Sequence, residues 1–276
     1  LKIGRTGLGP IRQFLDENKE EPFFMWYAPF LPHSPHNPPA RLLEKYRSKV
    51  KHLSTAKYYA MCEWFDETCG ELLDELDKRQ LAENTIVYYI TDNGWIQRNP
   101  ETPLPQGWRT SFAPKSKQSP FDGGLRTPVM IRWPKKIKPK MDTQTLVSSI
   151  DMVPTILSAA GIDLPENLPG ENLLPYCLGE AKSLSRSSLM GEIYAHDIAD
   201  LKDPSKSLLY EWCIDGYDKI IETHPGKIGA YRIVHSVVPQ GPLFFDLKSD
   251  PLEEQPLTEG PAKLKKALKE WRDQIK

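Results

Sequence analysis

Asp92 and Asn93 place a carboxylate and a carboxamide directly after the apolar run "IVYYI", which predicts a buried β-strand ending at this pair. Their oxygens are hard ligands that suit Ca²⁺, or Mg²⁺, better than zinc. Gly94, the next residue, allows the backbone to turn sharply. Because these residue types are also common in turns, two interpretations stay open: a metal site at the end of a strand, or a simple turn.

A proline-rich loop carries two histidines, His33 and His36, directly after the apolar and aromatic run at residues 22–30. Such a continuous run is typical of a strand that is covered on both faces. His33 is the candidate site residue, because a histidine just beyond a strand could donate a proton or contact an anion. His36 is more simply interpreted as a surface histidine.

Lys115 and Lys117 stand on a loop that returns to the next apolar run through Gly123 and Gly124. Adjacent glycines allow a close approach of two backbones, and a lysine offers a compact cation to an anionic group. Two solvated lysines would explain the same residues without any function.

The hydrophobic pattern predicts alternating strands and helices that would position these residues. We expect strands at 22–30, 85–90 and 127–133, and helices at 10–18, 54–81 and 148–162. This order is typical of an α/β sheet with parallel strands and helices on its faces, in which ligands bind beyond the carboxyl ends of the strands.

The pattern changes after about residue 185. Short β-rich segments separated by turns follow, and an amphipathic helix is expected at 261–275. We therefore predict two domains, residues 1–185 as an α/β domain and residues 186–276 as a small α+β domain with an antiparallel sheet and a closing helix.

The composition is that of an ordinary globular chain, with 276 residues, 39% hydrophobic and 26% charged. Because 36 Lys and Arg balance 37 Asp and Glu, no overall field indicates nucleic acid or an anionic membrane as a partner. No apolar run is long enough to predict a membrane span. The four cysteines lack zinc-site spacing, and Cys62 and Cys69 are expected as thiols.

In their order and spacing, these segments resemble the type I sulfatases of the alkaline phosphatase-like superfamily, over roughly residues 10–258. The matching stretches are "PFFMWYAPFLPHSP", "TIVYYITDNG", "KSKQSPFDGGLRTPVMIRWP", "SSIDMVPTILSAAGI" and "PLFFDLKSDPLEEQPL". The resemblance implies a partial alkaline phosphatase-like sheet in residues 1–185, as the C-terminal part of a catalytic domain. It also implies hydrolysis of sulfuric esters, but it does not identify the substrate.

The resemblance also implies a role for each candidate residue. Asp92 and Asn93 match the family's acid-amide pair, which helps to bind a divalent cation, usually Ca²⁺. His33 matches a histidine that contacts the sulfate or its leaving oxygen. Lys117 matches the lysine that binds the sulfate ester, whereas Lys115 is two residues out of register. The family also implies a periplasmic or extracellular location.

One part of the family pattern is missing from these residues. Sulfatases use a formylglycine nucleophile made from Cys or Ser in a C-x-P-x-R motif, and no Cys or Ser here stands in that context. The chain also begins without Met, directly before a helix. We therefore expect the C-terminal portion of a sulfatase, with about half of the active site and no activity alone.

The sequence identifies the substrate-binding residues less clearly than the metal-binding and catalytic candidates. Trp95, Arg109 and His196 are candidate substrate-binding residues, because aromatic and basic groups suit a sulfated sugar or an aryl sulfate. For Arg109 and His196, a structural role without contact to substrate is the simpler interpretation. Two other functions stay open. A related hydrolase could cleave phosphate monoesters or diesters with the same cation and lysine, or the chain could be a non-catalytic module that binds a cation or an anionic glycan.

Overall fold

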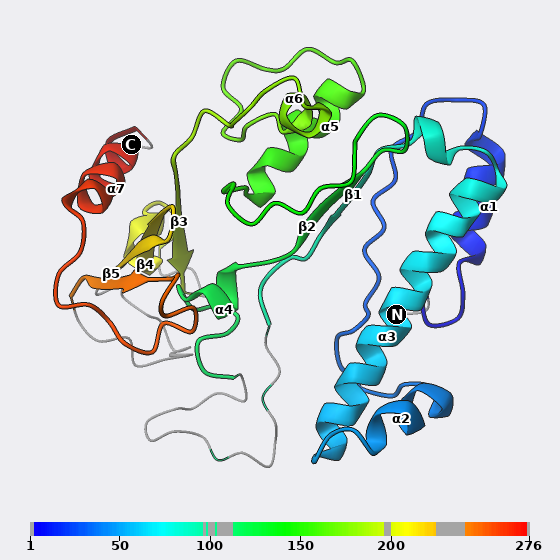
Figure 1. Ribbon diagram of the computed structural model, residues 1–276, viewed down its shortest axis with the longest axis horizontal. Coiled ribbons are helices and arrows are strands. Elements are labelled where there is room, and N and C mark those ends of the chain that lie inside the picture. The colour runs from blue at the N-terminus through cyan, green and yellow to red at the C-terminus, as the bar shows by residue number, and fades with distance from the viewer. Residues whose placement is uncertain are drawn as a thin grey trace. The chain divides into compact units, whose positions relative to one another are not determined.

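The computed structural model describes residues 3–95, 98, 103, 113–195, 200–224 and 241–274 (Figure 1). These residues form two compact units. The first unit contains the described residues up to Val87 together with Trp133–Lys135, and the second contains the other described residues from Tyr88 onward. No helix among the described residues has the length and apolar character needed to cross a membrane.

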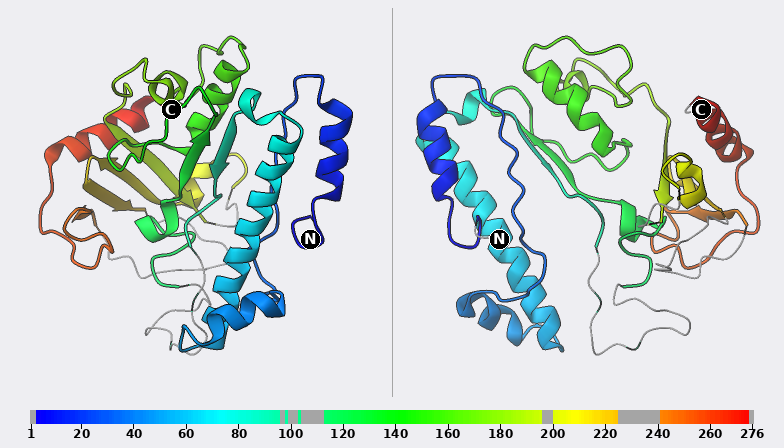
Figure 2. Two further views of the ribbon diagram at one scale, coloured as in Figure 1. Left: turned by 45° about the vertical axis from the view of Figure 1, so that its right-hand side comes forward. Right: turned by 180° about the vertical axis from the view of Figure 1, so that it is seen from behind.

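The first unit is built on three helices and a short 3-10 helix. Their bounds are α1 Gly9–Asn18, α2 Ala40–Arg47, α3 Leu53–Lys78 and η1 Ala82–Asn84. The apolar residues of α1 recur at helical spacing, so Ile11 and Leu15 are buried together against Leu76 of α3 and Ala82. Figure 2 shows α1 lying along α3. The predicted helices at 10–18 and 54–81 are therefore confirmed, whereas α2 was not predicted.

The predicted strand at residues 22–30 is wrong. The segment is extended, but the described residues provide no strand that pairs with it. Its side chains alternate, because Phe23, Met25 and Tyr27 pack against the core of the first unit while Phe24 and Trp26 remain 67% and 78% exposed. An apolar segment is buried on both faces only where other segments pack against both of them.

A two-stranded sheet pairs β1 Val87–Ile90 with β2 Val129–Arg132, and all of its residues except Val87 belong to the second unit. These strands confirm the predictions at 85–90 and 127–133. Short helices surround them in the chain: α4 Asp122–Leu125, η2 Ser149–Asp151, α5 Met152–Ala159 and α6 Leu174–Leu178. The helix expected at 148–162 starts as η2, where Ser148 and Asp151 form a capping box, and continues as α5.

The rest of the second unit is an antiparallel sheet with strand order β3-β4-β5-β6 and a helix packed on it. The bounds are β3 Ser188–Tyr194, η3 Pro204–Ser207, β4 Leu208–Asp215, β5 Asp218–Thr223, β6 Leu243–Asp246 and α7 Ala262–Gln274. Leu264 and Leu268 of α7 pack with Cys213, Ile220 and Phe244 of the sheet. The predicted sheet and closing helix are confirmed, and the domain boundary at residue 185 stays a prediction.

Candidate active site

The turn after β1 presents the acid-amide pair. The Asp92 side chain is exposed and Asn93 is half-buried. The Asn93 amide nitrogen donates to the Gly94 carbonyl at 2.6 Å, so its Oδ1 is the amide atom that can face a ligand. The pair therefore offers at most three side-chain oxygens. This donor set fits a hard cation such as Ca²⁺, and it fills only part of a shell of roughly six to eight oxygens.

A second loop, residues 113–125, packs its backbone onto this turn. The Gly94 N–H donates to the Gly124 carbonyl at 2.8 Å, and the Trp95 N–H donates to the Gly123 carbonyl at 3.0 Å. A Cβ placed on Gly94 would lie 2.2 Å from the Gly123 oxygen, which is far inside van der Waals contact. The glycines are therefore required by the close approach of the two backbones, as the sequence predicts.

The same loop carries both candidate lysines and uses them differently. The Lys117 N–H donates to the Trp95 carbonyl at 2.9 Å, which brings Lys117 to the turn of the acid-amide pair. Within the part of the chain that the structure describes, no hydrogen bond or ion pair engages the Lys117 ammonium. The Lys115 ammonium instead donates to the carbonyls of Leu252, at 3.2 Å, and Glu253. Lys115 is thus occupied in holding two segments together.

His33 lies in the first unit and is exposed. Its backbone N–H donates to the Phe30 carbonyl at 2.9 Å, and its Nδ1 lies 2.9 Å from the Ser34 carbonyl oxygen. Arg5 secures the loop by donating to the His33 carbonyl at 3.1 Å and to the Asn37 side chain. Sequence reasoning missed Arg5, because nothing in the local pattern connects it to a loop 28 residues away.

His36 differs from its predicted place on the surface. It is half-buried, and its ring centroid lies 5.6 Å from that of Tyr58. Burial lowers the pKa of His36, with a smaller contribution from the neighbouring His33 and Arg5. His36 therefore belongs to the packing between its loop and α3.

The structure thus brings four of the candidate residues together in the second unit, namely Asp92, Asn93, Trp95 and Lys117. The Trp95 side chain is 52% exposed beside the two glycines. Arg109 and His196 lie outside the described residues.

Another polar cluster resembles a metal site in its residue types. Glu211, Glu222 and His224 lie close enough to share one ion. However, Arg272 of α7 donates to both oxygens of Glu211, at 2.8 and 2.9 Å, and also to Glu222. Its guanidinium already occupies both oxygens of Glu211 and one oxygen of Glu222, so the cluster is an ion-pair network that joins α7 to the antiparallel sheet.

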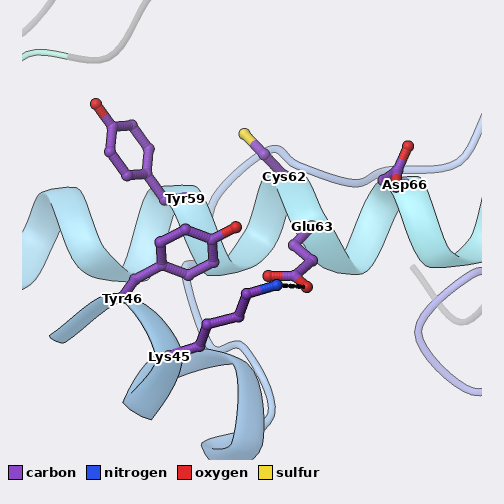
Figure 3. A pocket seen from close by; sticks show the side chains of 6 residues that line it. All are labelled: Lys45, Tyr46, Tyr59, Cys62, Glu63 and Asp66. Carbon is purple, nitrogen blue, oxygen red and sulfur yellow. Dashed lines mark hydrogen bonds and ion pairs between the residues drawn. The ribbon is translucent and has the colours of Figure 1, made fainter. Parts of the chain in front are cut away.

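An open cavity of about 470 Å³ lies between α2 and α3 in the first unit (Figure 3). Its lining residues are Lys45, Tyr46, Tyr59, Cys62, Glu63 and Asp66. The Lys45 ammonium and the Glu63 carboxylate already form an ion pair across it. Burial raises the pKa of the Cys62 thiol, which makes this cysteine less reactive. The cavity therefore shows no arrangement of groups suited to catalysis.

Two protein-family models match the chain. The Sulfatase model covers residues 8–162, and the model for the C-terminal part of N-sulphoglucosamine sulphohydrolase covers residues 115–276. Steryl-sulfatase of Rattus norvegicus is 28% identical over 258 residues, which are 89% of this chain and 43% of that protein. Arylsulfatase K of Homo sapiens is 31% identical over 208 residues, 75% of this chain and 34% of that protein. The chain spans less than half the length of these relatives.

Solved structures share the fold at lower identity. A protein from glycosaminoglycan metabolism in Bacteroides thetaiotaomicron has a TM-score of 0.69 at 23% identity, covering 99% of this chain and 54% of that one. A second solved structure, of a protein in complex with its substrate D-glucosamine-2-N,6-O-disulfate, has a TM-score of 0.55 at 23% identity. The match covers 85% of this chain and 44% of that one. Phosphonate monoester hydrolase of Agrobacterium radiobacter has a TM-score of 0.56 at 19% identity, covering 81% and 40%. The chain therefore belongs to the sulfatase family and has its alkaline phosphatase-like fold.

Proposed function

We propose that this chain supplies one side of the active site of a sulfuric ester hydrolase, acting on a sulfated carbohydrate or an aryl sulfate. Family membership supports the reaction class. One structural observation carries the assignment of residues: the hydrogen bond from the Lys117 N–H to the Trp95 carbonyl, at 2.9 Å. It joins the loop that carries Lys117, whose ammonium has no hydrogen-bond or ion-pair partner among the described residues, to the turn that carries the Asp92 and Asn93 side-chain oxygens.

Asp92 and Asn93 would hold a divalent cation, Ca²⁺ in preference to Mg²⁺, together with ligands from outside this chain. When bound, the cation offsets negative charge on the sulfuryl oxygens. The exposed Asp92 carboxylate and the Asn93 Oδ1 support this role, because both are hard ligands at the end of a strand. Formylglycine, the family's nucleophile, would likewise come from outside these residues.

Lys117 would contact the sulfuryl oxygens and stabilise the charge that develops on them as the ester bond breaks. Removal of one such preorganised group typically costs roughly 100- to 1000-fold in turnover. Lys115 is a poor candidate for this role, since its ammonium is bound to the carbonyls of Leu252 and Glu253.

His33 would hydrogen-bond to the leaving oxygen or protonate it. Arg5 supports this role indirectly, because its contacts restrict the loop that carries His33.

Substrate recognition would involve Trp95, with Arg109 and His196 as further candidates. The half-exposed indole of Trp95 offers an apolar face on which a sugar or aryl ring can stack. Glycan substrates are supported by the neighbour solved with D-glucosamine-2-N,6-O-disulfate.

We also infer a periplasmic or extracellular location, where polymeric glycan sulfates are accessible. Fractionation of the source cells tests this inference.

The assignment is tested in the full-length natural protein with an aryl sulfate and with sulfated glucosamine. Asp92→Ala is expected to lose bound Ca²⁺, measured by metal analysis after dialysis, together with most of its turnover. Lys117→Ala is expected to lower kcat by roughly 100- to 1000-fold, far more than Lys115→Ala, which removes an anchor of the loop but no group at the sulfuryl oxygens.

Three results would contradict the proposal. Full Ca²⁺ content in Asp92→Ala would refute the metal site, and equal kcat values for the two lysine variants would refute the choice of Lys117. Faster cleavage of a phosphate or phosphonate ester than of any sulfate ester would favour the related hydrolase class, which the Agrobacterium radiobacter neighbour exemplifies.

A further inference from the structure

Lys219 of β5 is fully buried and lies between two acidic side chains. Its ammonium is 2.9 Å from the Asp122 Oδ1 and 2.7 Å from the Glu253 Oε1. The Glu253 side chain is 1% exposed and that of Asp122 is 11% exposed. A buried charge is tolerated only when it is paired, so these three groups depend on one another for their positions. We call them the buried ion triad.

The loop of residues 113–125, which we call the Lys117 loop, contacts the buried ion triad near its C-terminal end. Asp122 begins α4 and directly precedes Gly123 and Gly124, whose carbonyls accept hydrogen bonds from the turn that contains Asn93 and Gly94. The backbone N–H of Asp122 donates to the Glu253 Oε2 at 2.5 Å. Glu253 therefore binds both the main chain of Asp122 and the ammonium that holds the Asp122 side chain.

The other end of the loop is tied to the same segment. Lys115 donates to the main-chain carbonyls of Leu252 and Glu253, and its ammonium lies 5.1 Å from the ring centroid of Phe121. Lys117 thus sits between two points, Lys115 and Asp122, that are both bound to residue 253. Contacts made by the C-terminal segment therefore limit where the Lys117 backbone can lie.

We infer that Lys219 and Glu253 are positioning residues, which hold the Lys117 loop against the Asp92–Asn93 turn so that the Lys117 ammonium meets the sulfuryl group. This inference rests on the proposed role of Lys117. Among the described residues, the antiparallel sheet contributes no candidate catalytic residue. It would then affect kcat only indirectly, because the Lys219 ammonium of β5 holds the loop that carries Lys117.

A purely structural role for the buried ion triad would have different consequences. The Arg272 network provides the comparison, because it also neutralises a buried acid, Glu211, on the same sheet. Among the described residues, no hydrogen bond or ion pair joins Arg272 to residues 113–125. Loss of either network is expected to destabilise the fold, but only loss of the buried ion triad is expected to change the geometry around Lys117.

The test compares variants of the full-length natural enzyme with an aryl sulfate as substrate. Glu253→Gln keeps the size of the side chain and an acceptor oxygen, and it leaves Lys219 paired with Asp122. We expect it to lower kcat by roughly 10- to 100-fold, because a displacement of about 1 Å near the reacting atoms has an effect of this size. KM is expected to change by less than about threefold. Arg272→Met, the matched control, is expected to lower Tm with kcat changed less than about twofold.

A double-variant cycle separates positioning from stability. If Glu253 acts through Lys117, Glu253→Gln is expected to lower kcat no further in a Lys117→Ala background. Lys219→Met is expected to behave as Glu253→Gln does, and if it fails to fold, Glu253→Gln decides the matter alone.

Each outcome has a distinct meaning. A lower Tm with unchanged kcat in Glu253→Gln, or independent additive losses in the double variant, would overturn the positioning role while the effect of Lys117→Ala still supports the proposed function. Unchanged kcat in Lys117→Ala itself would overturn the proposed function, and the positioning role with it.

Discussion

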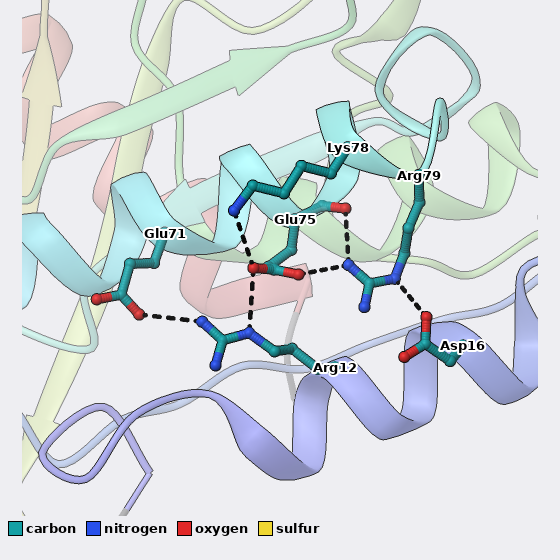
Figure 4. Close-up of polar contacts among 6 residues, drawn as sticks. All are labelled: Arg12, Asp16, Glu71, Glu75, Lys78 and Arg79. Carbon is teal, nitrogen blue, oxygen red and sulfur yellow. Dashed lines mark hydrogen bonds and ion pairs between the residues drawn. The ribbon is translucent and has the colours of Figure 1, made fainter.

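Glu75 is the centre of an ion-pair cluster that joins α1 to the end of α3 (Figure 4). Its side chain is 7% exposed and accepts hydrogen bonds from Arg12 of α1 at 3.1 Å, from Lys78 at 3.3 Å and from Arg79. Arg79 also donates to Asp16 of α1 at 2.8 Å. Glu75→Gln would remove the central charge while it keeps the shape of the side chain.

The size of the effect follows from the pKa of Glu75. Hydrogen bonds, above all from Arg79, lower it from 4.5 to about 2 although burial opposes the change. A pKa lowered to this extent corresponds to roughly 3 kcal/mol of free energy of unfolding at pH 7. Because Arg12 and Lys78 are 43% and 66% exposed, solvent weakens their contributions. We therefore expect Glu75→Gln to lower the stability of the first unit by about 1–3 kcal/mol.

The pH dependence gives the sharper test. A depressed folded-state pKa stabilises the fold above the unfolded pKa of 4.5, and this stability is lost as the pH falls towards 2. The full effect would leave only about 1 kcal/mol at pH 3. The difference between wild type and Glu75→Gln should thus shrink by more than about half from pH 7 to pH 3.

Denaturant unfolding of the full-length natural protein at both pH values measures this difference. Glu71→Gln is the matched control, since Glu71 is 51% exposed and makes one contact with Arg12 at 3.6 Å; its effect should stay below about 0.5 kcal/mol. A pH 7 difference for Glu75→Gln no larger than that of the control, or one that does not shrink at pH 3, would refute the reasoning.

Two further predictions concern close packing. Gly94→Ala would place a Cβ 2.2 Å from the Gly123 oxygen, so we expect a lower Tm and weaker Ca²⁺ binding at the proposed metal site, measured by calorimetry; wild-type values for both would contradict the close approach. Cys213 is fully buried, and burial raises its pKa to about 12. Its thiol should therefore resist labelling at pH 8 until the protein unfolds, whereas rapid labelling of the native protein would show that the site is accessible.

Elements defined by local pattern were predicted well. The helices α1, α3 and α7 show apolar residues at helical spacing. Helices α1 and α7 bury that face, as Ile11 and Leu15 do in α1, whereas most of the apolar residues of α3 are half-buried. The antiparallel strands also follow from alternating residues and turn signals. The segment 22–30 fails because burial of its second face depends on a neighbour, which is not a property of the segment itself.

Some features of the candidate site could likewise be predicted from the sequence, and others depend on the folded structure. The position of Asp92 and Asn93 at the end of a strand, and the need for glycine at 94, 123 and 124, follow from residue types and spacing. The different uses of Lys115 and Lys117 depend on folding, because the partners of Lys115 lie 137 and 138 residues away in the chain.

The ion pairs of the buried ion triad and of the Glu75 cluster could not be predicted from the sequence, and the physical reason is the same for both. Lys219 pairs with an acid 97 residues away, and Arg12 pairs with Glu75 across 63 residues. Secondary structure arises from interactions between near neighbours, which the order of residues displays directly. The pairing of buried charges instead requires that distant segments first be packed together, so it is decided by the three-dimensional arrangement of the chain.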